Sequence, residues 1–179
     1  MTTTTNLGMT LVDSAQAQKE VTINQAFTVL DAMIGLAVVD KDLATPPGSP
    51  ASGALYIVAA SPTGAWAGKA TQLTYFDQIW RFIVPQTGMR VWVKDEATYY
   101  QFTGTSWLAR SGTVDIAAGA TTATVSHALV SSTSIVLAVV RANDTTALLK
   151  NVVPASGSFT VRLNAAATAI TSVGYAIIQ

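Results

Sequence analysis

The sequence is poor in charge and contains no cysteine. Only 11% of its 179 residues are charged and half are hydrophobic, whereas about 25% of the residues of an ordinary soluble domain are charged. Without cysteine, the chain can form neither a disulfide bond nor a thiolate metal site. The missing charge is replaced by Ala, Thr, Ser and Gly, which lose little rotamer entropy on contact. This composition favours surfaces that are buried in an assembly.

The sequence also lacks a basic cluster and long apolar runs. Ten acidic and ten basic residues cancel, and no run of Lys or Arg marks a phosphate-binding face, so we expect no nucleic-acid partner. The longest apolar runs, such as "SIVLAVV", are too short to span a membrane. The start of the chain, "MTTTTNLGMTLVDS", lacks the basic and apolar regions of a signal peptide. We therefore expect no membrane insertion.

No pattern of catalytic residues stands out. The single histidine, His127, has no carboxylate near it in sequence, and the motif G-x-S-x-G is absent. The acidic residues are scattered, and the adjacent Asp95 and Glu96 would point to opposite faces of a strand. No metal-ligand spacing and no P-loop occurs. We expect a non-enzymatic protein with no metal and no cofactor.

The segment 16–42 carries the one strong helical pattern. A polar arm, residues 1–20, precedes a helix that we expect to begin near Thr22, because Thr22 and Gln25 fit a capping box. The helix has more apolar surface than one core needs. One apolar stripe comprises Ile23, Phe27, Leu30, Ile34 and Ala37; a second comprises Ala26, Val29, Met33 and Leu36. Two interpretations remain open: both stripes pack within the chain's own domain, or the second stripe is an oligomer interface.

The remainder of the sequence indicates β-structure. After the proline-rich "ATPPGSPASG", short alternating runs are typical of strands, and "QLTYFDQIWRFIVP" predicts a hairpin or a bent pair. Residues 113–179 contain six short strand patterns separated by turn signals, which predict a small β-sandwich. Within it, "SIVLAVV" is apolar on both faces, so we expect a central strand or a strand buried at an interface.

The predicted fold is therefore mainly β with one N-terminal α-helix. It comprises an α+β anchor region followed by a small β-sandwich-like module. The expected divisions are an anchoring arm at 1–20, a helix plus aromatic-rich β region at 21–110, and the sandwich-like module at 111–179.

Aromatic residues concentrate between positions 66 and 107. Indole and phenol rings stack on the C–H faces of sugars, and neighbouring polar groups can bind hydroxyls. In the alternative interpretation, these rings form the core of a small β-domain. A polar loop, "RANDTT", is a second candidate, with an Asx-type turn as its alternative. The candidate glycan-binding residues are Trp66, Tyr75, Asp77, Trp80, Arg81, Tyr99, Trp107, Arg141, Asn143 and Asp144.

Several segments carry a family resemblance in the same order. They are "NLGMTL…AQAQKEVTINQAFTVLDAM", "PPGSPASGALYIVAASPTGAWAG", "FDQIWRFIVPQTGMRVWVKDE" and "YYQFTGTSW". Together they resemble a domain family of unknown function found in tail fibres and head spikes of alphaproteobacterial phages and in gene transfer agents. The resemblance covers about residues 6–109. The C-terminal section is similar to β-rich modules of the same fibres.

The resemblance implies a virion surface protein, at the capsid vertex or on the tail, made in the bacterial cytoplasm. It implies a homo-oligomer, for which a trimer and a pentamer are both open, whose N-terminal arm contacts other virion proteins. Its distal part would attach the particle to host surface polysaccharide, with several linked copies multiplying weak contacts. The alternative is a purely structural capsid or tail decoration or adaptor that anchors another fibre and binds no glycan.

Overall fold

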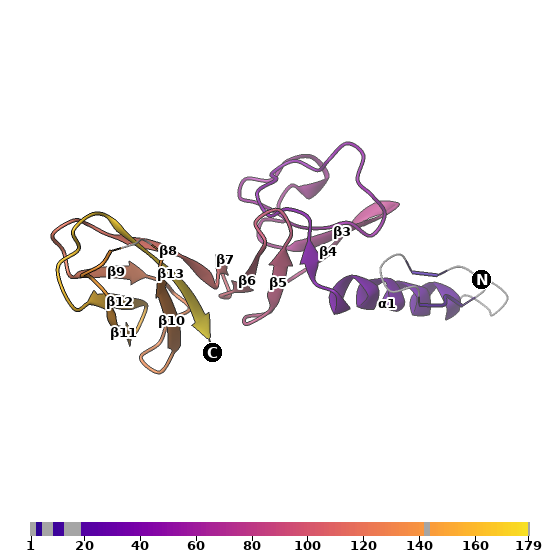
Figure 1. Cartoon of the computed structure of the whole chain (residues 1–179). Coiled ribbons are helices and arrows are strands. Elements are labelled where there is room, and N and C mark those ends of the chain that lie inside the picture. Colours follow the sequence, from indigo (N-terminus) through magenta and orange to yellow (C-terminus); the bar gives the residue numbers. More distant parts are fainter. Residues whose placement is uncertain (1–2, 5–8, 13–18, 142–143, 179) are drawn as a thin grey trace. The chain divides into compact units, whose positions relative to one another are not determined.

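The structure, a computed structural model, describes residues 3–4, 9–12, 19–141 and 144–178. Within these ranges it is mainly β with a single α-helix, which confirms the predicted fold class (Figure 1). The chain divides into two compact units: Met1–Ala97 with Gly104–Ser106, and Thr98–Thr103 with Trp107–Gln179. Each unit is described by itself below.

The helix of unit 1, α1, spans Lys19–Ile34. It begins three residues before the predicted start, so Thr22 lies inside the helix and the expected capping box is wrong. Lys19 and Glu20 are good helix formers and extend the first turn. The helix ends before Gly35, a residue that disfavours a helix interior.

The residues after Gly35 join the β-structure. The short strand β1, Ala37–Val38, pairs in parallel with β5, Arg90–Val93. The N–H of Trp92 donates to the carbonyl oxygen of Leu36 at 2.8 Å. Leu36 and Ala37 therefore lie outside the helix. The prediction that they are the last residues of the two helical stripes is wrong.

Three antiparallel strands form the second sheet of unit 1. They are β2, Leu55–Ile57; β3, Leu73–Asp77; and β4, Ile79–Ile83, in the order β2-β3-β4. The predicted hairpin is confirmed, because β3 pairs with β4. Its turn lies at Gln78, whose φ of 58° is left-handed. Tyr75 lies directly opposite Arg81 in this register.

The core beside this sheet is aromatic. Trp66 lies in the 3-10 helix η1, Gly64–Trp66, and is 0% exposed. Its ring centroid lies 5.0 Å from that of Trp80 and 5.7 Å from that of Tyr56, in tilted or edge-to-face geometry. Such ring pairs add to the stabilisation that burial provides. These rings therefore form part of the core of unit 1, as in the alternative interpretation of the aromatic residues.

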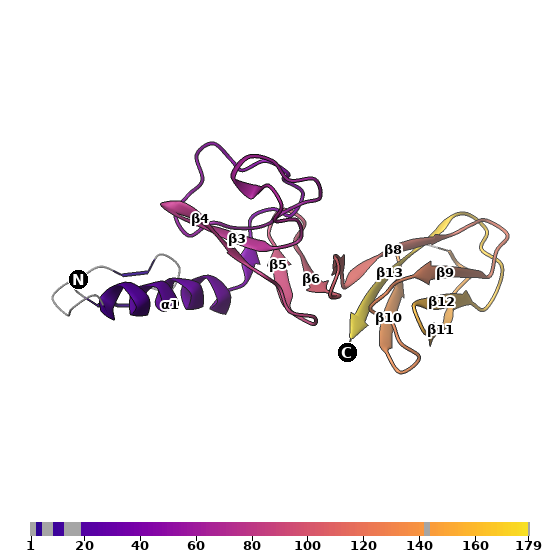
Figure 2. The same cartoon turned by 180° about the vertical axis from the view of Figure 1, so that it is seen from behind.

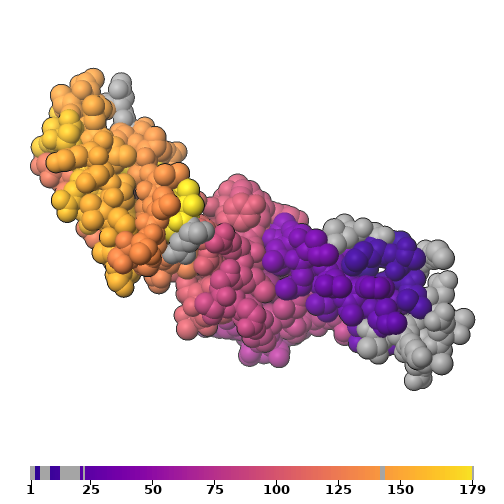
Figure 3. Space-filling model, turned by 90° about the horizontal axis from the view of Figure 1, so that it is seen from below, coloured from indigo at the N-terminus to yellow at the C-terminus, as the bar shows by residue number. Residues whose placement is uncertain are grey.

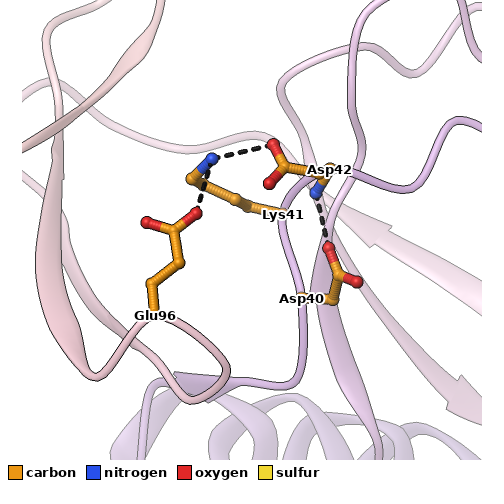
Figure 4. A network of polar contacts seen from close by, with 4 residues as sticks. All are labelled: Asp40, Lys41, Asp42 and Glu96. Atoms are coloured by element: carbon orange, nitrogen blue, oxygen red, sulfur yellow. Dashed lines mark hydrogen bonds and ion pairs between the residues drawn. The ribbon is translucent and has the colours of Figure 1, made fainter.

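A charged network holds two loops of unit 1 together (Figure 4). The ammonium of Lys41 lies 2.7 Å from a carboxylate oxygen of Asp42 and 2.8 Å from one of Glu96. The N–H of Asp42 donates to the carboxylate of Asp40 at 2.6 Å. The network therefore ties the loop after β1 to the turn after β5.

Unit 2 is a β-sandwich of two three-stranded antiparallel sheets, preceded by the hairpin of β6, Thr98–Phe102, and β7, Trp107–Ala109. All six strand patterns of residues 113–179 form strands (Figure 2). They are β8, Ser111–Ile116; β9, Thr122–Ser126; β10, Ile135–Val140; β11, Leu149–Ala155; β12, Ser158–Leu163; and β13, Thr171–Ile178. The sheet orders are β10-β13-β8 and β11-β12-β9.

Inward residues of both sheets form the sandwich core. Ile116, Phe159, Val161 and Val173 are each 0% exposed. Phe159 packs against Tyr175 with ring centroids 4.9 Å apart. This core is aliphatic with few rings, in contrast to the aromatic core of unit 1.

The position of β10 corrects one prediction. The strand lies at an edge of its sheet and is not central. Its outward residues Ile135, Leu137 and Val139 are 60%, 56% and 62% exposed. Both faces of β10 are apolar, but within this chain only one of them packs against the core. The alternative expectation, burial at an interface between chains, stays a prediction.

His127 has a structural position inside unit 2. Its Nδ1 accepts from the N–H of Leu129 at 3.3 Å, so Nε2 carries the proton and donates to the carbonyl oxygen of Ala109 at 2.9 Å. The imidazole thereby connects the end of β7 with the loop after β9.

Candidate functional site

Residues 3–4 and 9–12 of the N-terminal arm lie beside α1 (Figures 1 and 2). The Thr4 hydroxyl donates to the Asp31 carboxylate at 2.7 Å, and Asp31 is 3% exposed. The Asn24 amide accepts from the N–H of Val12 at 2.8 Å and donates to its carbonyl oxygen at 2.9 Å. For these described residues of the arm, the helix of the same chain supplies the partners. The contact of the arm with other virion proteins stays a prediction.

A polar pocket of about 330 Å³ lies between the arm, α1 and the β3–β4 hairpin. This volume is sufficient for a small ligand such as a sugar residue. Its lining is dominated by hydrogen-bonding side chains and lies wholly within unit 1. The residues are Thr3, Thr4, Leu11, Val21, Asn24, Gln25, Thr28, Asp31, Ala32, Gly53, Tyr75, Asp77, Gln78 and Arg81.

The hairpin supplies the charged part of the pocket. Arg81 Nε lies 3.8 Å from a carboxylate oxygen of Asp77, and both side chains are 35% exposed. This separation is longer than a hydrogen bond, so both groups keep bonding capacity toward a ligand. Tyr75 is 2% exposed. Burial raises the pKa of the Tyr75 phenol, while Arg81 lowers it and Asp77 raises it, so the phenol remains neutral at pH 7.

The helix supplies a polar wall of the pocket. Asn24, Thr28 and Asp31 recur at intervals of four and three, which places them on one face of α1. The apolar pattern of segment 16–42 did not indicate a role for these polar residues. Their spacing was the signal that could have indicated this role, because a polar stripe on a helix can face polar groups of the protein as well as solvent.

The pocket chemistry suits a ligand rich in hydroxyl groups. The Arg81 guanidinium can only donate hydrogen bonds, the Asp77 carboxylate can only accept them, and the amides of Gln25 and Gln78 can do both. A sugar hydroxyl is both a donor and an acceptor and can use all of these groups. Asp31 is already hydrogen-bonded to the Thr4 hydroxyl, so its main role is to attach the arm to α1 at the wall of the pocket.

The structure brings three of the ten predicted glycan-binding residues into this pocket: Tyr75, Asp77 and Arg81. Trp66 and Trp80 lie together in the aromatic core instead. The ring of Trp66 is fully buried and offers no face to a sugar, which corrects its expected role as an exposed platform. Its Nε1 has no hydrogen-bond partner among the residues that the structure describes.

Two further predicted aromatics lie in the β6–β7 hairpin of unit 2. Tyr99 is 55% exposed on β6. Trp107 is half-buried, and its ring centroid lies 5.2 Å from that of Phe102. Tyr99 therefore has the more accessible ring of the two.

The loop after β10 carries the last three predicted residues. The Asp144 carboxylate accepts hydrogen bonds from the N–H groups of Thr146, Ala147 and Thr168, each at 2.9 Å, and from the hydroxyls of both threonines. The backbone hydrogen bonds hold the pKa of Asp144 well below its usual range. Its carboxylate stabilises the loop, as in the Asx-turn alternative. Arg141 is exposed at the end of β10, and Asn143 lies outside the described residues.

An apolar face of α1 beside the arm-contacting face is exposed. Ile23, Leu30 and Ile34 are 41%, 48% and 65% exposed, and the helix lies at the surface in Figure 3. This first stripe was expected to pack on the chain's own β-structure, and these exposures correct that expectation. In the second stripe, Ala26 and Val29 are exposed and Met33 is half-buried, and the expected role of this stripe as an oligomer interface stays a prediction. The face that the chain itself covers is the polar one, around Asn24 and Asp31.

The described residues also bear on metal sites and on membrane-spanning helices. No group of three or more His, Asp or Glu side chains that could hold a metal ion occurs in the part of the chain that the structure describes. Likewise, none of the helices in that part is long and apolar enough to cross a membrane.

Comparison with known proteins adds one match. No curated protein matches the chain. Residues 23–108 match a family described as protein of unknown function (DUF2793). The matched region begins inside α1 and ends in β7, so it includes the helix side of the pocket and the β3–β4 hairpin. Residues 23–108 of this chain thus form a DUF2793 domain, a domain of unknown function.

Proposed function

We propose that this protein is a non-enzymatic virion surface protein, a phage or gene-transfer-agent head spike or tail fibre, that attaches the particle to host surface polysaccharide. The observation that carries the proposal is the polar pocket of unit 1, where Asp77, Gln78 and Arg81 meet the polar face of α1. The pocket offers donors and acceptors in the mixture that sugar hydroxyls require.

The open apolar face of α1 supports the oligomeric part of the proposal. Ile23, Phe27, Leu30 and Ile34 repeat at intervals of four, three and four, the spacing of a short coiled-coil seam. Helices of several copies would bury this face against each other and present several pockets at once. Linked pockets convert weak sugar contacts into strong attachment.

A binding experiment tests the glycan part. Immobilised full-length protein is exposed to polysaccharides extracted from a panel of alphaproteobacteria, and binding is measured by interferometry. We expect Arg81→Ala to weaken binding of any bound polysaccharide at least tenfold, because a buried or half-buried charged donor is worth about 1.5–3 kcal/mol. Arg162→Ala, which removes an exposed arginine of β12, is the matched control. Equal binding by wild type and Arg81→Ala would refute the pocket as the site.

The solution mass tests the oligomeric part. Light scattering of the full-length protein is expected to give a trimer or a pentamer. The double variant Leu30→Ser and Ile34→Ser is expected to lower the mass, whereas Val84→Ser, at an apolar position that is 64% exposed in the same unit, is not. A monomeric wild type would contradict assembly through α1.

The open helix face also favours a second candidate, a structural adaptor that anchors another virion fibre without binding glycan. In that case another virion protein covers the apolar face of α1. A monomer in isolation that binds no polysaccharide of the panel, and becomes incorporated only into assembling particles, would support this function.

A further inference from the structure

The outward face of the sheet β10-β13-β8 in unit 2 has an ordered arrangement of side chains. Outward residues on the three strands lie in rows, because β13 pairs in antiparallel register with both neighbours. The rows are Arg141 beside Ser172 beside Asp115, Val139 beside Gly174 beside Thr113, and Leu137 beside Ala176 beside Ser111.

The three strands differ in the size of these side chains. On β10 they are large and apolar, and Leu137 and Val139 are more than half exposed. On the central strand β13, Gly174 and Ala176 are small, whereas Ile178 at the end of the strand pairs with Ile135 and is 45% exposed. A groove of about 440 Å³ runs along this face and is lined by residues of all three strands. The face is therefore a large apolar ridge beside a groove lined by small residues.

We propose that this face binds the same face of a second copy of this chain, about a two-fold axis parallel to β13. Rotation about that axis places the β10 ridge of each copy over the β8 strand of the other. Leu137 then lies over Ser111 and Val139 over Thr113, so large side chains meet small ones. Gly174 and Ala176 lie near the axis, with the Arg141 methylenes against Gly174, and Ile178 lies at the end of the same strand.

The charges on the face fit the same rotation. Arg141 is held in the row of Ser172 by the hydrogen bond from its N–H to the Ser172 carbonyl oxygen at 2.8 Å. Asp115 pairs with Ser172 from the other side. The rotation places Arg141 of each copy over Asp115 of the other, so two opposite-charge pairs form per dimer. This charge complementarity selects a second copy as the occupant over an uncharged apolar partner.

The expected contact is small. Three strands about 4.8 Å apart and about 20 Å long present roughly 300 Å² per copy. This area is below the roughly 800 Å² per partner of a stable interface. The face therefore associates weakly between free molecules and strongly only where copies are already held close together. It is independent of the α1 contact and of glycan binding.

Cross-linking of the full chain tests the proposal. The protein has no cysteine, so Ala176→Cys introduces a single thiol near the proposed axis. A short bismaleimide should join two copies at least tenfold faster than in Asn151→Cys, which places the thiol at an exposed site on β11 of the other sheet. Equal rates for the two variants would overturn the proposal.

A charge exchange in the Ala176→Cys background sharpens the test. Arg141→Asp alone and Asp115→Arg alone should each slow cross-linking about tenfold, because each replaces two attractive pairs by two repulsive ones. The combination should restore the rate to within about twofold of the parent. A combination as slow as the single variants would show that these residues do not face each other. Circular dichroism of each variant confirms that the sandwich is folded.

Discussion

The two units fill their cores in different ways. Unit 1 has strands of two to five residues, and its core around Trp66, Tyr56 and Trp80 is aromatic. Unit 2 has longer paired strands, and its core consists mostly of Val, Leu, Ile and Ala around Phe159. Large rings fill the irregular space between loops, whereas branched aliphatic residues fit the regular spacing of strands. Unit 1 also buries aliphatic residues, among them Val38, Leu73 and Val91, so the contrast between the units lies in the aromatic cluster around Trp66.

The largest expected effect comes from the rings themselves. Trp66→Ala and Phe159→Ala should each cost about 3–5 kcal/mol, because both side chains are fully buried. Hydrogen exchange should show that Trp66→Ala releases amides of unit 1 while those of β12 stay protected. Trp66→Phe should cost less, since it keeps a ring and removes a buried N–H without a partner among the described residues. Loss of protection in both units from either variant would contradict separate cores.

The next effect concerns the contact between the arm and α1. Thr4→Val removes the hydroxyl that donates to the buried carboxylate of Asp31 and should cost about 1–3 kcal/mol of local stability. Limited proteolysis should then cleave the arm faster. Thr10→Val, at an exposed position of the same arm, is the matched control. Equal cleavage of the two variants would show that the Thr4 hydroxyl does not hold the arm.

A pH-dependent effect is expected in unit 2. The pKa of Asp144 is lowered in the folded state by backbone hydrogen bonds, so the folded state holds the proton less tightly than the unfolded state. The resulting stability is present above the ordinary aspartate pKa of about 3.9 and is lost as the pH falls below it. Asp144→Asn should reduce this dependence in thermal unfolding between pH 7 and pH 3. Identical pH profiles for wild type and Asp144→Asn would contradict the role of this carboxylate.

The smallest effect on stability belongs to the pocket. Asp77 and Arg81 are one-third exposed and 3.8 Å apart, so Arg81→Ala should change the free energy of unfolding by less than about 1 kcal/mol. Urea denaturation measures it. A larger loss would mean that Arg81 supports the fold, and weaker polysaccharide binding by the variant would then not identify a ligand contact.

Local patterns in the sequence predicted more of unit 2 than of unit 1. Strand alternation is a local signal, and all six strand patterns of the sandwich form strands. The order of strands in a sheet depends on contacts between distant segments, so the edge position of β10 was not readable from "SIVLAVV". The register of β3 and β4 places Tyr75 opposite Arg81, and this pairing and its meeting with α1 depend on packing between distant segments.

The same limit applies to the helix. The spacing of its apolar residues predicted the helix, and the spacing of its polar residues matches the wall of the pocket. Neither pattern indicated which face of the helix the rest of the chain would cover. The arm covers the polar face because the Asn24 amide and the Asp31 carboxylate find hydrogen-bond partners there. Burying such groups without partners is costly. The positions of these hydrogen bonds therefore determined which face of α1 the arm covers.

The bond between Asn24 and Val12 has a consequence for how the arm can evolve. The Asn24 amide bonds to the peptide N–H and the carbonyl oxygen of Val12, a pair of groups that every residue except proline provides. Position 12 can therefore accept many substitutions while the arm stays attached, whereas proline there would remove the donor. Relatives with diverged arms can share the same attachment, and the arm is free to acquire new sequence for new neighbours.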